Sequence, residues 1–303
     1  MQIFNKKDFY KNGFYIIKNL LNRQEIEKYK NSINKKRYSL INQNAASVDK
    51  DGTFKIKTSD PSIFKDYSEY DDENLWDYVS NPKLINNINE LLCEKAYFVH
   101  DLGLLDPGSN PNNDSSWHRD SPCRTTGIGP DWDPNIKYNV VTAITYLHSS
   151  EDCGTGLNVI PGSHKLSYKY TISNIFRYLH LKTRNKKILK FLRELITKIN
   201  GVTIKYEAGD CIVFLCTLYH HANLLNVRNK DSVYRQCITT RYGGIGKHSN
   251  NYIDYVTYKR KEMNKYSNSK KKDQFFDYIK KKKIFISIPK ESKKIDGSYV
   301  KKK

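Results

Sequence analysis

The stretch Ala208-Gly-Asp-Cys-Ile-Val-Phe-Leu-Cys-Thr-Leu-Tyr-His-His221 carries the strongest local structural signal in the chain. Its Gly-Asp pair is typical of a turn, and the apolar run that follows is typical of a buried strand. The run ends in two adjacent histidines. We therefore expect a strand over residues 210–218 that places one histidine deep inside a β-barrel.

The segments around this stretch have the same strand-like character. They are residues 96–105, 139–147, 156–160, 202–206 and 233–242. Many short strands separated by turn residues predict a sandwich or a barrel, so the expected fold class is β-rich α+β. Apolar spacing predicts flanking helices over residues 24–36 and 82–92, and a basic helical insertion over 167–200 that interrupts the strands.

Composition limits the classes of protein to consider. The chain has 303 residues, which suits one large domain or two small ones, and its 13% aromatic content excludes disorder over most of the length. The net charge is +20, and +11 of it (17 basic minus 6 acidic residues) lies in residues 251–303. We therefore predict a main domain over 1–250 and a Lys-rich C-terminal extension over 251–303, with a surface helix at 273–283. Residues 42–72 are polar and are expected to be irregular.

The cysteines and the hydropathy bear on the compartment. The six cysteines form no CxxC pair, so we expect reduced thiols and a cytoplasmic protein. No apolar run approaches the roughly 20 residues that a membrane-spanning helix needs. We therefore expect no membrane span.

Three elements of the sequence carry chemistry. Trp117-His118-Arg119-Asp120 holds an H-x-D pair, and residues two apart on a strand point to the same side. One of the histidines at 220 and 221 supplies a second imidazole about 100 residues later. Two histidines and one carboxylate form the facial triad of non-haem Fe(II) oxygenases. Arg235, at the start of the next strand, offers a bidentate clamp for a carboxylate.

Several motifs resemble those of the phytanoyl-CoA dioxygenase family, whose members are Fe(II)- and 2-oxoglutarate-dependent oxygenases. The resemblance spans roughly residues 5–245. It rests on Phe9-Tyr-Lys-Asn-Gly-Phe-Tyr-Ile-Ile-Lys-Asn-Leu-Leu, the Trp117 motif, Gly154-Thr-Gly-Leu-Asn-Val-Ile-Pro-Gly-Ser-His164-Lys, the segment from Ala208 to the paired histidines, and Arg235-Gln-Cys-Ile-Thr-Thr-Arg-Tyr242. Pro-Gly-Ser-His-Lys is the most specific of these motifs.

The resemblance implies a double-stranded β-helix (a jelly roll, cupin-like) with flanking helices. It implies that His118, Asp120 and one of the paired histidines hold Fe(II). Arg235 would bind the distal carboxylate of the cosubstrate 2-oxoglutarate, and His100 would line the pocket. The implied reaction consumes O2 and hydroxylates an unactivated C–H bond of a small molecule. Halogenating relatives have a small residue in place of the carboxylate at Asp120, so its presence here favours hydroxylation.

Two assignments stay open at this point. The family's usual strand length, counted forward from Gly209, points to His220 as the distal ligand. The spacing counted back from Asn226 points to His221 instead. We favour His220, because a loop absorbs an insertion more easily than a strand does. Arg241 competes with Arg235 for the cosubstrate carboxylate, but Tyr242-Gly-Gly marks it as the far end of the strand, and we favour Arg235.

The substrate is not readable from the sequence. The insertion 167–200 follows the Pro-Gly-Ser-His motif, so we expect either a lid that attracts an anionic substrate or a packed helical pair. A non-catalytic β-helix binding protein is one alternative function, and a basic nucleic-acid-binding protein is another. No RNA-binding aromatic motif supports the second, and the oligomeric state is not predicted.

Overall fold

The structure is a computed structural model of the whole chain. It describes residues 6–44, 46–48, 54–56, 73–99, 103–105, 117–120, 138–165, 186–224, 236–245, 249, 252 and 272–286.

The chain folds into helices and short, mostly antiparallel strands. The helices are α1 (Lys6–Asn12), α2 (Arg23–Asn42), α4 (Glu73–Val79), α5 (Pro82–Leu92), α7 (Ser150–Cys153), α9 (Lys186–Asn200) and α12 (Lys272–Lys281). The strands are β1 (Phe14–Ile17), β2 (Ala46–Val48), β3 (Phe54–Ile56), β4 (Tyr97–Phe98), β5 (Gly103–Leu105), β6 (Val140–Tyr146), β7 (Thr155–Val159), β8 (Val202–Ile204), β9 (Cys211–Leu215), β10 (His220–Leu224), β11 (Cys237–Gly243) and β12 (Phe285–Ile286).

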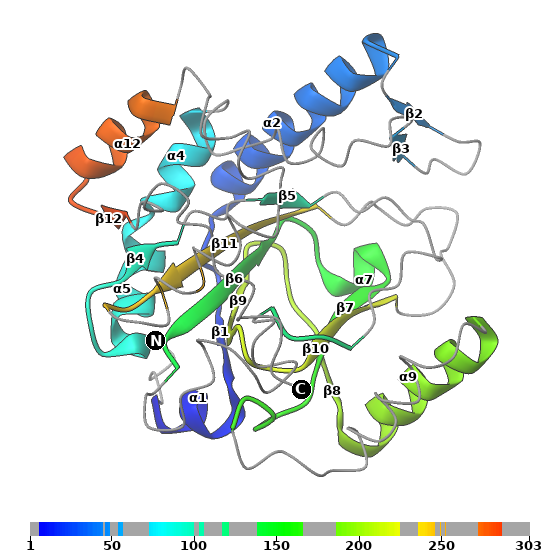
Figure 1. Cartoon of the computed structure of the whole chain (residues 1–303). Coiled ribbons are helices and arrows are strands. Elements are labelled where there is room, and N and C mark those ends of the chain that lie inside the picture. Colours follow the sequence, from blue (N-terminus) through cyan, green and yellow to red (C-terminus); the bar gives the residue numbers. More distant parts are fainter. Residues whose placement is uncertain are drawn as a thin grey trace, which may run out of the picture.

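Two sheets form the body of the protein. The main sheet has the order β1-β9-β6-β11-β4-β12, with β5 paired to β11, and the small sheet has the order β10-β7-β8. All of their pairings are antiparallel except that of β12 with β4. Helices α4, α5 and α12 lie on one side of the main sheet, and α9 lies on the other side next to β8 (Figure 1). The expected combination of antiparallel strands with flanking helices is confirmed.

Strand β9 shows why the sequence reads as one apolar run. Ile212 and Phe214 pack into a cluster with Leu157 and Val159 of the small sheet. Val213, between them, points to the opposite face and joins the core under the helices. Successive side chains on a strand alternate between faces, and here both faces are buried. The main sheet therefore lies between the helices and the small sheet.

The expected single strand over 210–218 is wrong. Strand β9 ends at Leu215, a turn follows in which the Leu218 amide donates to the Leu215 carbonyl over 2.8 Å, and His220 begins a new strand, β10, in the small sheet. The turn residues from Cys216 to Tyr219 are at most 4% exposed. Because a buried turn is as apolar as a buried strand, the apolar pattern alone could not reveal the crossing between sheets.

Other expected boundaries also change. The predicted strand 96–105 is present as the two short strands β4 and β5, and the predicted irregular segment 42–72 contains the hairpin of β2 and β3. Helix α5 coincides with the predicted 82–92, and α2 is longer than the predicted 24–36. Of the predicted insertion 167–200, the structure describes α9; residues 166–185 lie outside the described residues.

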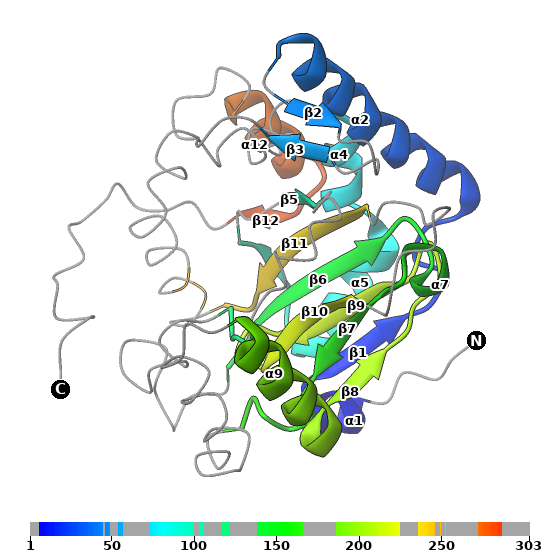
Figure 2. The same cartoon turned by 90° about the vertical axis from the view of Figure 1, so that its right-hand side faces the viewer.

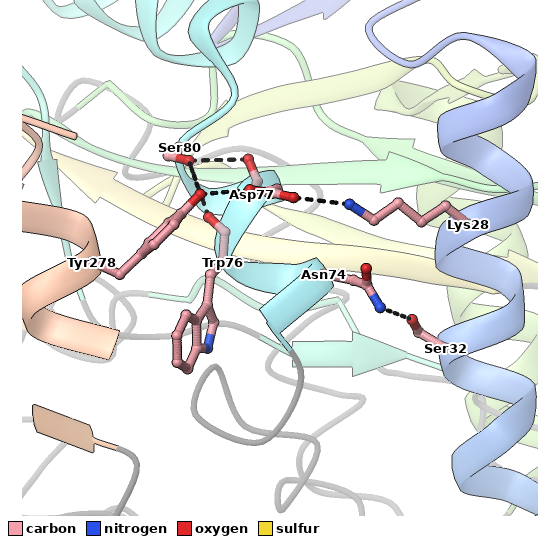
Figure 3. A network of polar contacts seen from close by, with 7 residues as sticks. All are labelled: Lys28, Ser32, Asn74, Trp76, Asp77, Ser80 and Tyr278. Atoms are coloured by element: carbon pink, nitrogen blue, oxygen red, sulfur yellow. Dashed lines mark hydrogen bonds and ion pairs between the residues drawn. The ribbon is translucent and has the colours of Figure 1, made fainter. Parts of the chain in front are cut away.

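The C-terminal helix is more than a surface helix. Phe275 and Ile279 of α12 are fully buried in the core beneath the main sheet. A polar network holds the same helix to α4 and α2 (Figure 3). In it, Asp77 of α4 accepts a 2.5 Å hydrogen bond from the Tyr278 hydroxyl and lies 2.9 Å from the Lys28 ammonium of α2. Residues from the Lys-rich segment 251–303 thus complete the main core.

The sequence predicted reduced cysteines and no membrane-spanning helix. The structure gives Cys93, Cys153, Cys211, Cys216 and Cys237 as free thiols. Among the described residues, no helix is both long enough and apolar enough to cross a bilayer.

Candidate metal centre

Backbone pairing brings two histidines together from distant parts of the chain. The His118 amide donates to the His220 carbonyl and the His220 amide donates to the His118 carbonyl, each over 3.0 Å. The two residues form an isolated antiparallel bridge, and their rings lie 4.3 Å apart. A reciprocal pair of this kind fixes both Cβ atoms on the same side of the bridge. The bridge thus sets the two imidazoles side by side.

Asp120 turns one carboxylate oxygen toward this pair. Its Oδ1 lies 3.7 Å from His118 Nε2 and 3.6 Å from His220 Nε2. The ligand atoms of the three residues all lie within 4.8 Å of one another. Adjacent ligands of a transition metal, each about 2.1 Å from the ion, are roughly 3 Å apart. Small side-chain rotations would therefore close the three atoms around one cation, and the donor set fits Fe(II).

The other oxygen of Asp120 has partners of its own. Oδ2 accepts a 2.7 Å hydrogen bond from Thr142 Oγ1 of β6 and lies 3.0 Å from Arg241 Nη2 of β11. The Asp120 and Arg241 side chains are 11% and 9% exposed. Burial by itself raises the pKa of Asp120, but the Arg241 charge, the two imidazoles and the Thr142 hydroxyl together hold it well below its usual range. Asp120 is thus a carboxylate fixed by its outer oxygen.

His220 is held as a neutral imidazole. Its Nδ1–H donates to the Leu218 carbonyl over 3.0 Å, which leaves the lone pair on Nε2, toward Asp120. Burial lowers the pKa of His220 to about 4, helped by the neighbouring His118 and opposed by Asp120. The ring also packs against Phe214 at 4.5 Å. At neutral pH this nitrogen is therefore available to a metal ion.

His221 points away from the cluster of His118, Asp120 and His220. Asn158 Nδ2 of β7 donates to His221 Nε2 over 2.9 Å, and the ring lies edge-on against Trp117 at 4.4 Å. Thr203 Oγ1 of β8 in turn donates to Asn158 Oδ1 over 2.7 Å. Neighbours on a strand point to opposite faces, so only one of the paired histidines can reach the centre. The geometry favours His220.

An apolar cluster adjoins the centre. It contains Trp117 and Tyr219, which directly precede the two histidines of the bridge. The other members are Ile160, which follows β7, and Ile196 of α9. The His118 side chain is 42% exposed, whereas that of His220 is 7% exposed. The centre is therefore closed on the His220 side and open on the His118 side.

Two expected site residues lie outside the described residues, namely Arg235 and His100. His164 is described. Its Nε2–H donates to the Tyr10 carbonyl over 3.1 Å, so it joins the Pro-Gly-Ser-His turn to α1 and takes no part in the centre.

Thr142 was not predicted from the sequence, and Arg241 was considered only as a competitor of Arg235 for the cosubstrate carboxylate. A signal was present for the arginine, because it is the one charged residue of its strand, and a charged side chain in a buried strand needs a partner of opposite charge. Thr142, in the run Val-Val-Thr-Ala-Ile-Thr-Tyr, carried no such signal.

Comparison with known proteins identifies a family. The model of the family Phytanoyl-CoA dioxygenase (PhyH) matches residues 9–224. No curated protein matches the chain.

Solved structures give weaker likenesses. The non-haem monooxygenase ThoJ in its nickel complex has 13% identity and a TM-score of 0.50, with 79% of this chain and 76% of that chain covered. Apo HygX from Streptomyces hygroscopicus has 11% identity and a TM-score of 0.50, with 80% and 87% covered. EctD from S. alaskensis with 2-oxoglutarate and 5-hydroxyectoine has 17% identity and a TM-score of 0.48, with 80% and 76% covered. The first two likenesses show a shared fold and no more.

Proposed function

The chain belongs to the phytanoyl-CoA dioxygenase family and is a 2-oxoglutarate-dependent dioxygenase, and from this premise we propose that it hydroxylates an unactivated C–H bond of a small molecule. The observation that carries the proposal is the convergence of His118, Asp120 and His220 on one point. Asp120 also favours hydroxylation over halogenation, because its carboxylate fills the position that halogenating relatives leave to chloride.

His118 Nε2, Asp120 Oδ1 and His220 Nε2 are the atoms that would hold Fe(II). When bound, the iron supplies, with 2-oxoglutarate and O2, the oxidising power for the reaction. Arg235 is the proposed partner of the distal 2-oxoglutarate carboxylate, and His100 is a proposed pocket residue. Both assignments rest on the family resemblance.

The chain's own residues prepare this centre in three ways. Thr142 and Arg241 hold Asp120 ionised and leave one oxygen for the metal. The Leu218 carbonyl fixes the His220 tautomer. Trp117 and Tyr219 keep water from one flank, because their cluster is buried. The exposed His118 side is where a small substrate would enter.

The finer architecture is part of the proposal. The main sheet and the small sheet would be the two halves of a double-stranded β-helix, supported by the cluster that their facing side chains form. The oxygenase domain would span 1–250, with 251–303 as an extension that contributes α12 and β12 to it. The positive charge of the chain supports an anionic substrate. The cytoplasmic location stays a prediction from the cysteines.

The test is anaerobic titration of the full chain with Fe(II) and 2-oxoglutarate. We expect the weak visible absorption of the ternary complex, followed on admission of O2 by succinate release in a metabolite screen. The variants His118→Ala, Asp120→Ala and His220→Ala should lose the absorption. His221→Ala is the matched control and should keep it.

Two outcomes would overturn the proposal. If His221→Ala lost the absorption while His220→Ala kept it, the assigned distal ligand would be wrong. If the unmodified chain bound neither metal nor cosubstrate, the fold would serve as a non-catalytic binding scaffold instead.

A further inference from the structure

Helix α9 has a wider apolar surface than the core covers. Leu192 and Ile196 are 7% and 1% exposed and face the interior. Phe191, in contrast, is 61% exposed, and Ile188 and Ile199 are each 46% exposed. These three follow one another at helical spacing, so they form a second apolar stripe beside the buried one. Val202 of β8, 48% exposed, continues it; these four residues are called the α9 patch.

The patch is unusual within the described part of the chain. It holds four of the six large hydrophobic side chains that are exposed there; of the other two, Tyr38 lies on α2 and Ile245 follows β11. Single exposed apolar residues are ordinary, whereas a run of them on one helix marks a contact surface.

The charge around the patch restricts the partner. Residues 165–200 contain ten Lys and Arg and a single acidic residue, Glu194, giving a net charge of +9. Within α9 there are five basic residues, and Glu194 and Lys198 are both exposed. A basic helix with exposed Phe and Ile is typical of segments that lie in the headgroup region of anionic membranes.

We propose that the α9 patch docks on an anionic lipid surface. Phe191 and the two isoleucines would enter the boundary between headgroups and acyl chains, and basic residues of α9 such as Lys198 would contact anionic headgroups. A second copy of this chain is a poorer occupant, because it would bring another α9, with five basic residues and one acidic residue, to the same contact.

The position of α9 connects this surface to the metal centre. Its inner residue Ile196 packs in one cluster with Trp117 and Tyr219, which precede His118 and His220. A bilayer bound to the α9 patch would therefore rest on a helix that itself packs against the residues preceding the two histidines. The docking itself needs neither metal nor cosubstrate, so it stands or falls independently of the proposed reaction.

The test is co-sedimentation of the full chain with vesicles of phosphatidylcholine, with and without added phosphatidylserine. We expect binding to the serine-containing vesicles only, with loss of binding at high salt. Phe191→Asp should weaken binding by about tenfold or more, because a large apolar side chain leaves the membrane. Lys198→Glu lowers the charge by two units, and each unit should weaken vesicle binding by roughly fivefold.

Matched controls are Tyr38→Asp and Ile245→Asp, which alter equally exposed apolar residues outside the patch and should bind like the unmodified chain. Circular dichroism and thermal melting would establish that every variant is folded. The proposal is overturned if the chain binds no vesicles, if it binds neutral ones equally, or if Phe191→Asp and Tyr38→Asp behave alike. It is also overturned if Phe191→Asp turns a dimer into a monomer without vesicles, since the patch would then be a subunit interface.

Discussion

Arg241 Nη2 lies 3.0 Å from Asp120 Oδ2, on the side of the carboxylate opposite the two imidazoles. The two oxygens of Asp120 thus have separate tasks, since Oδ2 is engaged by the chain and Oδ1 remains for a cation. This division sets Asp120 up as a ligand through a single oxygen. Outer partners that orient a ligand in this way typically contribute 10- to 100-fold to metal affinity.

Replacing Arg241 tests that arrangement. We expect Arg241→Met to raise the dissociation constant for Mn(II), followed by electron paramagnetic resonance, by about tenfold. Arg241→Lys keeps a cation at this position and should recover part of the affinity. The guanidinium also repels a divalent ion. If this repulsion were its only effect, Arg241→Met would lower the dissociation constant for Mn(II). Tighter binding in Arg241→Met would therefore refute the orienting role.

Thr142 offers a second and milder test. Thr142→Val has almost the same shape but removes the 2.7 Å hydrogen bond to Asp120, so we expect several-fold weaker Mn(II) binding. Thr145→Val is the matched control, since Thr145 lies on the same strand but bonds to Tyr78 on the helix-covered face. The control should lower the free energy of unfolding by about 1 kcal/mol and leave the metal affinity unchanged. Equal effects on metal binding would contradict the assignment.

The sequence predicted the strands and the metal-binding group for a shared physical reason. An apolar run followed by histidine, and an H-x-D pair 100 residues earlier, are local patterns whose residues carry the chemistry themselves. The Arg241–Asp120 pair joins two strands through tertiary packing, and no local pattern specifies which buried acid a buried arginine meets. The turn after Leu215 escaped notice because its residues are as buried as those of the strands on either side.

Helix α12 shows a related limit of sequence reading. The Lys-rich character of the segment favoured a surface helix, although the helix also carries the aromatic pair Phe275 and Phe276. Both are buried in the structure. Whether an amphipathic helix lies on a surface or completes a core depends on which other elements its apolar face contacts. The local sequence pattern does not contain that information.

His164 predicts a pH dependence of stability. Burial lowers its pKa from 6.5 to about 4, and the bond to the Tyr10 carbonyl only partly opposes this. Between these two values the unfolded chain takes up a proton that the folded chain does not. The free energy of unfolding therefore falls as the pH falls, with this residue contributing at most about 1.4 kcal/mol per pH unit.

Urea unfolding from pH 7 to pH 4 measures this contribution. His164→Gln, which cannot titrate, should show a smaller loss than the unmodified chain over the same range. Because His220 also has a lowered pKa, part of the slope should remain in the variant. An unchanged slope in His164→Gln would show that His164 titrates normally in the folded protein.

Truncating Phe275 tests whether the C-terminal segment belongs to the main core. Its ring is fully buried and lies 5.8 Å from Trp76 and 5.9 Å from Phe98, in edge-on contacts. We expect Phe275→Ala to lower the free energy of unfolding by about 3–5 kcal/mol in urea, because a large cavity would open between α12 and the main sheet. Tyr278→Phe on the same helix removes the hydroxyl that donates to Asp77 and lies 3.5 Å from Ser80 Oγ, and should cost about 1 kcal/mol or less. If the two variants were equally stable, residues 251–303 would be a detachable extension, and the main sheet would be complete without α12.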